Sequence, residues 1–170
     1  IRQIKFNNKV IFYGENSDND YIIKNIKLES DGSHFDLYEK DKLLSNFFVP
    51  LYGHHMVMNT AASIIVAFQN NLTVEEIKKL LENFKNAARR FAIEEVNGTI
   101  IVDDYAHHPT EVKVTLQAIR QKYPDKRLTV IFRPNTYSRT SAFKNEFASA
   151  LSEADKVYLA TDPDREGEAI

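Results

Sequence analysis

Residues that could do chemistry are most concentrated between positions 100 and 111, in the run Ile-Ile-Val-Asp-Asp-Tyr-Ala-His-His-Pro-Thr-Glu. The β-branched residues at 100–102 are typical of a buried strand, and Pro109 suits the first turn of a helix. The polar residues between them therefore follow the carboxyl end of a strand, where open α/β sheets bind ligands. A carboxylate at this strand end, Asp103 or Asp104, can accept hydrogen bonds from ribose hydroxyls, and an imidazole, His107 or His108, can orient or deprotonate an amine. The alternative is a strand-to-helix turn whose polar residues are only structural.

A second junction of this kind spans residues 132–140, where Arg133 and Arg139 stand between a predicted strand and a predicted helix. Helix N-termini favour anions, and the two guanidinium groups add fixed positive charge. Successive parallel strands present their carboxyl ends at one edge of a sheet. We therefore expect the two junctions to lie side by side.

Two smaller groups of polar residues come earlier in the chain. His55 and Asn59 are four residues apart and share one face of a predicted helix, as ligands or as packed side chains. Arg89 and Arg90 precede Phe91 and suit phosphate oxygens, although paired arginines are usually solvated surface. We do not expect a zinc site, because the adjacent histidines point in different directions and no acidic ligand spacing supports one; they are His54, His55, His107 and His108.

The predicted elements in the first half of the chain position His55 and Asn59. Residues 9–49 alternate apolar stretches with turn formers, which predicts antiparallel strands in series, the first of them at 10–13. A helix follows from His55, and a second helix has Thr73 as N-cap, with Glu76 completing a capping box. Leu72 is placed for a hydrophobic staple with Ile77, and the predicted buried stripe is Ile77, Leu80, Leu81 and Phe84.

The second half alternates strand and helix. Asn97-Gly98 between residues 93–96 and 99–102 predicts a hairpin with a type I′ turn. A helix at 112–123, a strand at 128–132, a helix capped by Ser138 and a strand at 156–160 follow, which indicates parallel strands with right-handed crossovers. The predicted fold is α/β: antiparallel hairpins plus two helices, then a partial Rossmann-like parallel βαβαβ unit. We place the domain boundary between residues 90 and 91, giving domains 1–90 and 91–170.

Composition restricts the class of protein. Hydrophobic residues make up 43% of the 170 residues, charged residues make up 27%, and the formal net charge is −2, which argues against a nucleic-acid binder. The longest apolar run, 61–68, is too short to span a bilayer. Cysteine is absent and no signal peptide opens the chain, so we expect a cytoplasmic protein. Ile1 in place of Met suggests a processed or excised fragment.

The run from Asp103 to Glu111 resembles the signature of the Mur ligases, most closely of the branch that adds L-alanine to the peptidoglycan precursor. The agreement covers about residues 10–160 and continues, in order, through Gly53-x-His55 with Asn59, Arg89-Arg90-Phe91, and Phe132-x-Pro134 with Tyr137-Ser138-Arg139-Thr140. The resemblance implies a three-domain cytoplasmic enzyme that uses ATP and Mg²⁺ to join L-alanine to UDP-N-acetylmuramate through an acyl phosphate. The chain would hold the later part of the central ATPase domain and part of the Rossmann-like C-terminal domain.

The resemblance also implies roles for individual residues. His55 and Asn59 would lie on the adenine side of the ATP site, Arg90 would reach the phosphates, and Asp104 would face the ribose. Tyr105, His107 and His108 would line the amino-acid side, and Arg139 would hold the substrate carboxylate or phosphate. Arg90 and His107 are the expected catalytic residues.

Parts of the pattern of a complete family member are missing from this sequence. It contains no G-x-x-x-x-G-K-[ST] phosphate loop, and no UDP-binding domain precedes it, so we expect the fragment to be inactive alone. The last ten residues resemble the acidic Toprim motif of type IA topoisomerases, with Asp162, Asp164 and Glu166 as weak candidates for Mg²⁺ ligands and no other metal site expected. The alternatives are a non-catalytic nucleotide- or protein-binding module, or a chimera with a Toprim-like tail.

Overall fold

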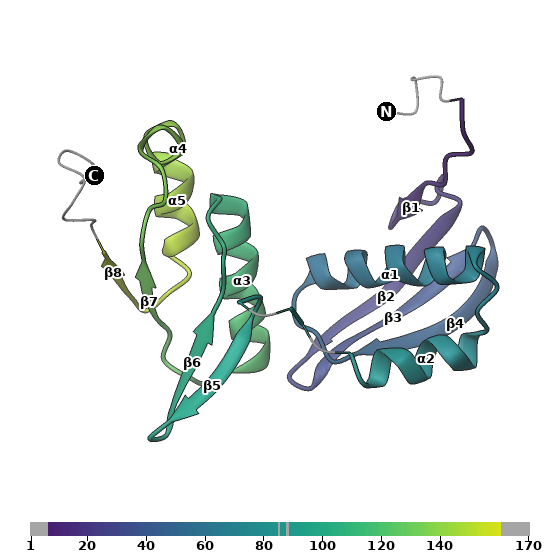
Figure 1. Cartoon of the computed structure of the whole chain (residues 1–170), viewed down its shortest axis with the longest axis horizontal. Helices are drawn as coiled ribbons and strands as arrows, with labels where there is room; N and C mark the ends of the chain where they lie inside the picture. The colour runs from purple at the N-terminus through teal and green to yellow at the C-terminus, as the bar shows by residue number, and fades with distance from the viewer. Residues whose placement is uncertain (1–6, 85, 88, 161–170) are drawn as a thin grey trace. The chain divides into compact units, whose positions relative to one another are not determined.

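The computed structural model describes residues 7–84, 86–87 and 89–160 (Figure 1). The chain divides into two compact units, Ile1–Phe84 and Lys85–Ile170, and each is described by itself. The predicted boundary between residues 90 and 91 falls just inside the second unit. Among the described residues, no helix combines the length and apolar character needed to span a bilayer.

The first unit is built on a four-stranded sheet whose strands follow one another in chain order: β1 (Tyr13–Gly14), β2 (Tyr21–Glu29), β3 (Gly32–Glu39) and β4 (Lys42–Val49). The predicted antiparallel pairing is confirmed for β2, β3 and β4. The strand predicted at 10–13 is wrong, because β1 has only two residues and runs parallel to β2. The amide of Phe12 donates to the Asp20 carboxylate at 2.8 Å, so this amide is bonded to a side chain and not to the backbone of a neighbouring strand.

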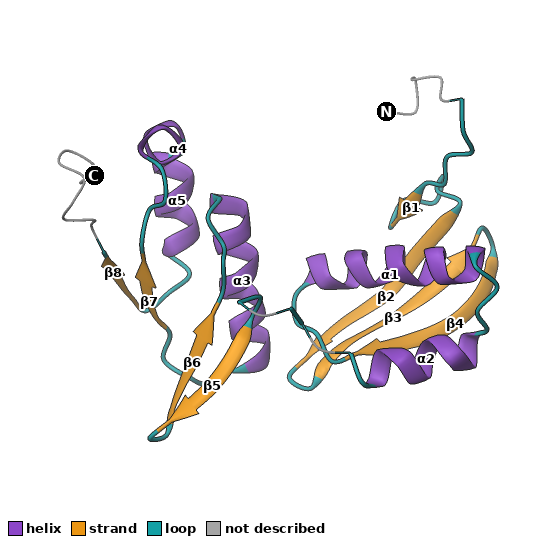
Figure 2. Ribbon diagram, viewed as in Figure 1, coloured by secondary structure: helices purple, strands orange, loops and turns teal. Residues whose placement is uncertain are grey.

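Two helices complete the first unit: α1 (His54–Gln69) lies along the sheet, and α2 (Val74–Glu82) contacts β4 (Figure 2). The core is formed by fully buried apolar side chains from sheet and helix, among them Ile23, Phe35, Leu37, Phe47, Val57 and Ala61. The predicted capping box between Thr73 and Glu76 is present, and Leu72 and Ile77 pack in the same cluster. The predicted stripe is too wide, since Leu80 and Phe84 are 62% and 49% exposed.

The second unit begins with the predicted hairpin, β5 (Ala92–Val96) and β6 (Thr99–Asp103). Asn97 and Gly98 have φ values of 51° and 76°, as a type I′ turn requires. The chain continues through α3 (Pro109–Lys122), β7 (Thr129–Phe132), α4 (Tyr137–Ala142), α5 (Lys144–Leu151) and β8 (Lys156–Leu159). The predicted parallel pairing is confirmed for β7 and β8.

The helix predicted to start at Ser138 is two helices. Its N-cap is Thr136, and Ser138 lies inside α4. Phe143 ends α4 and precedes α5 with a non-helical φ of −117°. Its ring packs against His108 with centroids 5.0 Å apart, which gives a tertiary reason for the break.

Between β6 and β7 the structure has an open slot in place of a strand pair. No ladder joins these two strands among the described residues, so the sheet of this unit consists of two separate pairs. The slot has a volume of about 720 Å³ and is lined by successive residues of both strands, with α3 contributing Val112, Leu116 and Ile119. Lining by successive residues places the slot at the strand edges, because neighbouring side chains in a strand point to opposite faces.

Candidate functional site

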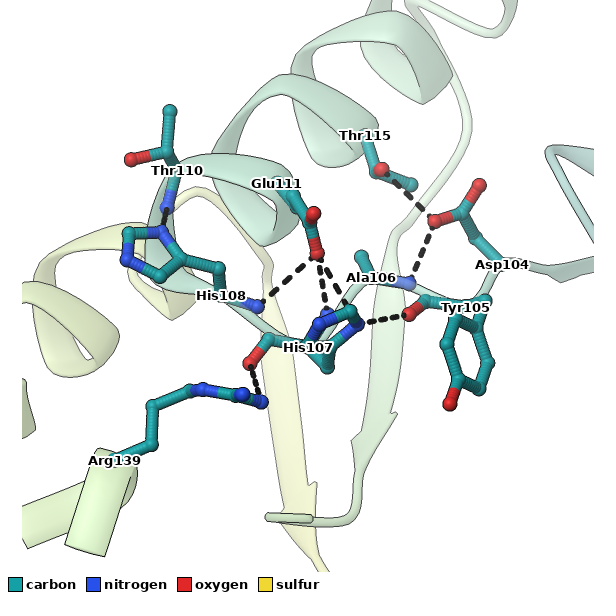
Figure 3. Close-up of polar contacts among 9 residues, drawn as sticks. All are labelled: Asp104, Tyr105, Ala106, His107, His108, Thr110, Glu111, Thr115 and Arg139. Atoms are coloured by element: carbon teal, nitrogen blue, oxygen red, sulfur yellow. Dashed lines mark hydrogen bonds and ion pairs between the residues drawn. The ribbon is translucent and has the colours of Figure 1, made fainter. Parts of the chain in front are cut away.

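The loop from Asp104 to His108 joins β6 to α3 and holds most of the predicted site residues (Figure 3). Asp104 fixes the start of this loop. Its carboxylate accepts from the amides of Phe91 and Ala106, both at 2.8 Å, and from the hydroxyl of Thr115 at 3.3 Å. A carboxylate has about four acceptor positions. Most of the hydrogen-bonding capacity of Asp104 is therefore already used within the protein.

Glu111 fixes the other end of the loop from the first turn of α3. Its Oε2 accepts from the amide of His107 at 2.9 Å and from the amide of His108 at 3.2 Å. Partial burial acts to raise the pKa of Glu111, but the backbone bonds from His107 and His108 and the nearby charges of His107 and Arg90 outweigh it and lower the pKa. Glu111 is therefore held as a carboxylate at the helix N-terminus, where negative charge is favoured.

His107 lies between these two acids and is oriented through one ring nitrogen. Its Nδ1 is 3.0 Å from the carbonyl oxygen of Tyr105 and 3.4 Å from Oε2 of Glu111. The Tyr105 ring meets the imidazole edge-on, with centroids 5.2 Å apart. The side chain is 31% exposed, so the imidazole is fixed yet accessible.

His108, the next residue of the motif, helps to hold the fold together. It is the N-cap of α3, and its Nδ1 accepts from the amide of Thr110 at 3.3 Å. Its ring also packs against Phe143. One face and one nitrogen of His108 are thus used by the fold, and its predicted contact with substrate stays a prediction.

Arg139 brings the second predicted junction to the first. It lies on α4, and its Nη1 donates to the carbonyl oxygen of His107 at 3.4 Å (Figure 3). The ring contact between His108 and Phe143 joins the same two segments. The loop after β6 therefore meets α4, the helix that follows β7, as the sequence predicted from the shared place of the two junctions at strand ends.

Arginine side chains gather around the exposed ring of Tyr105. The guanidinium carbons of Arg89 and Arg90 lie 5.3 and 5.9 Å from the ring centroid. Arg89 and Phe91 both have positive φ values, 57° and 52°, which non-glycine residues adopt only at a cost. The amide of Tyr105 donates to the carbonyl of Arg89 at 3.0 Å, and Asp104 holds the amide of Phe91. The loop thus holds the arginine segment in a strained conformation that presents two cations beside an aromatic face.

The remaining predicted residues, His55 and Asn59, belong to α1 of the first unit. His55 is half-buried and Asn59 is exposed. The preceding Gly53 has a φ of 92°, a conformation that favours glycine at this helix start. Their predicted contact with adenine is not tested by the geometry of that unit.

The weak candidates for Mg²⁺ ligands, Asp162, Asp164 and Glu166, lie outside the described residues. Within the part of the chain that the structure describes, the one group of three potential ligands is Glu29, Asp31 and His34, whose ligand atoms lie within 4.8 Å of one another. Glu29 and Asp31 are exposed; Glu29 ends β2, and Asp31 lies in the turn between β2 and β3.

Sequence reasoning missed the parts played by Glu111 and Thr115. A signal for Glu111 existed, because a glutamate three residues after an N-cap completes a capping box. Histidine is an unusual N-cap, so His108 concealed that box. Thr115 gave no signal, since only the folded loop brings its hydroxyl to Asp104.

Comparison with known proteins gives two family matches in chain order. The Mur ligase middle domain matches residues 1–67, and the Mur ligase glutamate ligase domain matches residues 88–170. The UDP-N-acetylmuramate–L-alanine ligase of Ligilactobacillus salivarius is 45% identical over 159 residues, which is 94% of this chain and 36% of that protein. The enzyme of the same name from Leuconostoc citreum is 45% identical over 152 residues, covering 89% of this chain and 34% of that protein.

Solved structures show the same fold at lower identity. The UDP-N-acetylmuramate–alanine ligase of Thermotoga maritima has a TM-score of 0.78 at 24% identity, over 91% of this chain and 34% of that one. The MurF ligase of Thermotoga maritima, solved in complex with ADP, has a TM-score of 0.70 at 23% identity, over 94% of this chain and 36% of that one. The chain spans about a third of the length of the relatives that it matches. It belongs to the Mur ligase family and carries parts of the middle and C-terminal domains.

Proposed function

We propose that the complete protein containing this chain is an ATP-dependent ligase that joins L-alanine to UDP-N-acetylmuramate in peptidoglycan synthesis. The observation that carries the proposal is the 45% identity to ligases of that name across 94% of this chain. The site agrees with it chemically, because cations, a fixed imidazole and an exposed aromatic ring gather at the β6–α3 loop.

The proposed reaction has two steps. The muramyl carboxylate first takes the terminal phosphoryl group of ATP, which gives an acyl phosphate and ADP. The amine of L-alanine then attacks the acyl carbon, the bond to the phosphate oxygen breaks, and phosphate leaves with that electron pair. The nitrogen loses its protons as the amide forms. Positive charge near the phosphates and a base near the amine would each lower a barrier.

Within this scheme we assign the described residues as follows. Arg90 and Arg139 would stabilise the phosphate and carboxylate charges. His107 would receive the amine, with Tyr105 and His108 lining that side. Asp104 would reach the ribose with its remaining acceptor position, while His55 and Asn59 of the first unit would contact the adenine.

Mg²⁺ would be held mainly by groups outside the described residues. Magnesium prefers phosphate and carboxylate oxygens. Asp104 and Glu111 already accept backbone hydrogen bonds, so neither offers an open ligand set. The phosphate loop is absent from the sequence as well. We therefore propose that the chain alone is inactive. In the complete ligase it would contribute the residues that bind the amine and the arginines that bind the phosphates.

A segment replacement tests this proposal. Residues 7–160 would replace the matching segment of the Ligilactobacillus salivarius ligase, and phosphate release from ATP would be measured with and without L-alanine. We expect release that needs both L-alanine and UDP-N-acetylmuramate, and we expect His107→Ala in the hybrid to impair the use of L-alanine more than that of ATP. The isolated chain should show no turnover.

The controls decide between the ligase and a non-catalytic module. Thermal unfolding of the hybrid shows whether it folds. A folded hybrid that binds ATP but releases no phosphate with L-alanine would support the module instead. Turnover of about 1 per second by the isolated chain would contradict its assignment as an incomplete site.

A further inference from the structure

The position of the proton on the His107 imidazole can be derived from its neighbours. The two groups near Nδ1 are the Tyr105 carbonyl oxygen, at 3.0 Å, and the Glu111 carboxylate, at 3.4 Å. A carbonyl oxygen can only accept a hydrogen bond, and so can an ionised carboxylate. A neutral imidazole carries one proton on one nitrogen. Two acceptors beside Nδ1 are both satisfied only when that proton is on Nδ1.

The opposite tautomer would be disfavoured by the same geometry. With the proton on Nε2, the lone pair of Nδ1 would face two oxygen lone pairs. Glu111 cannot easily move away, because the amides of His107 and His108 hold the same Oε2 atom. Nor can the loop turn freely, because Asp104 ties the amides of Phe91 and Ala106 at its other end.

We propose that Glu111 is a positioning residue: with the Tyr105 carbonyl it keeps His107 in the Nδ1–H form and leaves the Nε2 lone pair for an amine. The consequence for the reaction rests on the proposed function. Nε2 lies on the side of the ring away from Glu111, and the imidazole is partly exposed. Nε2 can take one proton from the ammonium group of the amino acid, which frees the nitrogen lone pair for attack on the acyl carbon. The imidazolium then has a carboxylate beside its Nδ1–H.

The test reads the tautomer directly in the 170-residue chain, without substrates. Long-range ¹H–¹⁵N correlation spectra of the labelled chain separate a protonated ring nitrogen from one with a lone pair. We expect His107 to show a protonated Nδ1 and an unprotonated Nε2 at a pH where the ring is neutral. Glu111→Gln keeps an acceptor for the two amides but removes the charge. We expect this variant to lower the ratio of Nδ1–H to Nε2–H about fivefold, a typical effect for a partly exposed charge contact.

Glu76→Gln is the matched control, because Glu76 is the corresponding capping-box carboxylate of α2 in the first unit. It should weaken a helix cap without changing the His107 spectrum. Our proposal would be overturned by a wild-type His107 protonated on Nε2, or by Glu111→Gln leaving the ratio unchanged. The wild-type spectrum decides the first point even if a variant fails to fold. A correct tautomer combined with an inactive hybrid ligase would refute the proposed function and leave this assignment intact.

Discussion

Replacing Asp104 by alanine should destabilise the second unit by about 1.5–3 kcal/mol. Two of its hydrogen bonds, from the amides of Phe91 and Ala106, are 2.8 Å long and have a charged acceptor. A hydrogen bond to a charged group contributes about 1.5–3 kcal/mol, and we take about half of that for each because the donors are only partly buried. The bond from Thr115, at 3.3 Å, adds little. Phe91 also has a positive φ that these contacts maintain.

The chain offers a control at the adjacent position. Asp103 is 57% exposed and its carboxylate is 3.6 Å from Nε of Arg89, which is 66% exposed. Such exposed pairs contribute little, so Asp103→Ala should cost less than about 0.5 kcal/mol. Both variants lose one negative charge, but only Asp104→Ala also loses the two backbone hydrogen bonds.

The assay must report on each unit separately, because two units need not unfold together. Urea titrations followed by NMR give one unfolding curve from the amides of Val102 and Leu116 and another from the amide of Ile23 in the first unit. We expect Asp104→Ala to shift only the former. Equal stabilities of the Asp103→Ala and Asp104→Ala variants would show that the hydrogen bonds of Asp104 to the amides of Phe91 and Ala106 do not stabilise the second unit.

Three further predictions follow from individual contacts. Ser33→Ala should cost about 1–2 kcal/mol in the first unit, measured by urea unfolding, because the fully buried hydroxyl donates to the carbonyl of Leu51 at 2.8 Å. Gly32→Ala should destabilise that unit by about 2–3 kcal/mol, since an added Cβ would lie 2.5 Å from a backbone oxygen. At Gly98 an added Cβ would have no atom within 4 Å, so Gly98→Ala should cost only about 1 kcal/mol, because of the φ of 76°. The pKa of Glu111 is lowered from 4.5, so its contribution to stability is complete above pH 4.5 and is lost as the pH falls through the lower value. Glu111→Gln should therefore reduce the loss of unfolding free energy of the second unit as the pH is lowered, measured by urea unfolding at several pH values.

Local patterns in the sequence were enough for elements whose signals are local. The type I′ turn at Asn97-Gly98 and the capping box of Thr73 depend on a few neighbouring residues, and both are present. The two-residue β1 and the break at Phe143 depend on distant partners, namely the Asp20 carboxylate and the His108 ring. Periodicity cannot reveal either partner, because each contact forms only after the chain has folded.

The limits were similar for the candidate site. The meeting of Arg139 with the His107 loop was predictable, because it follows from two junctions at the ends of parallel strands. The gap between β6 and β7 was not predictable, since the crossover pattern says nothing about which strands are adjacent. Nor could residue type show how many acceptor positions of an acid are already occupied.

That last point changes how the motif from Asp103 to Glu111 is understood. Read as a sequence, its acids are candidates for ligand contacts. In the structure, Asp103 is exposed beside Arg89, while Asp104 and Glu111 each accept two backbone amides and fix the ends of one loop. The groups left available to a ligand are then the cations and the imidazole. An acid that fixes a loop is needed whether or not it touches substrate, so loss of activity after mutation of Asp104 would not by itself show a contact with ribose. Only a measurement that separates ATP binding from the stability of the second unit can assign that contact.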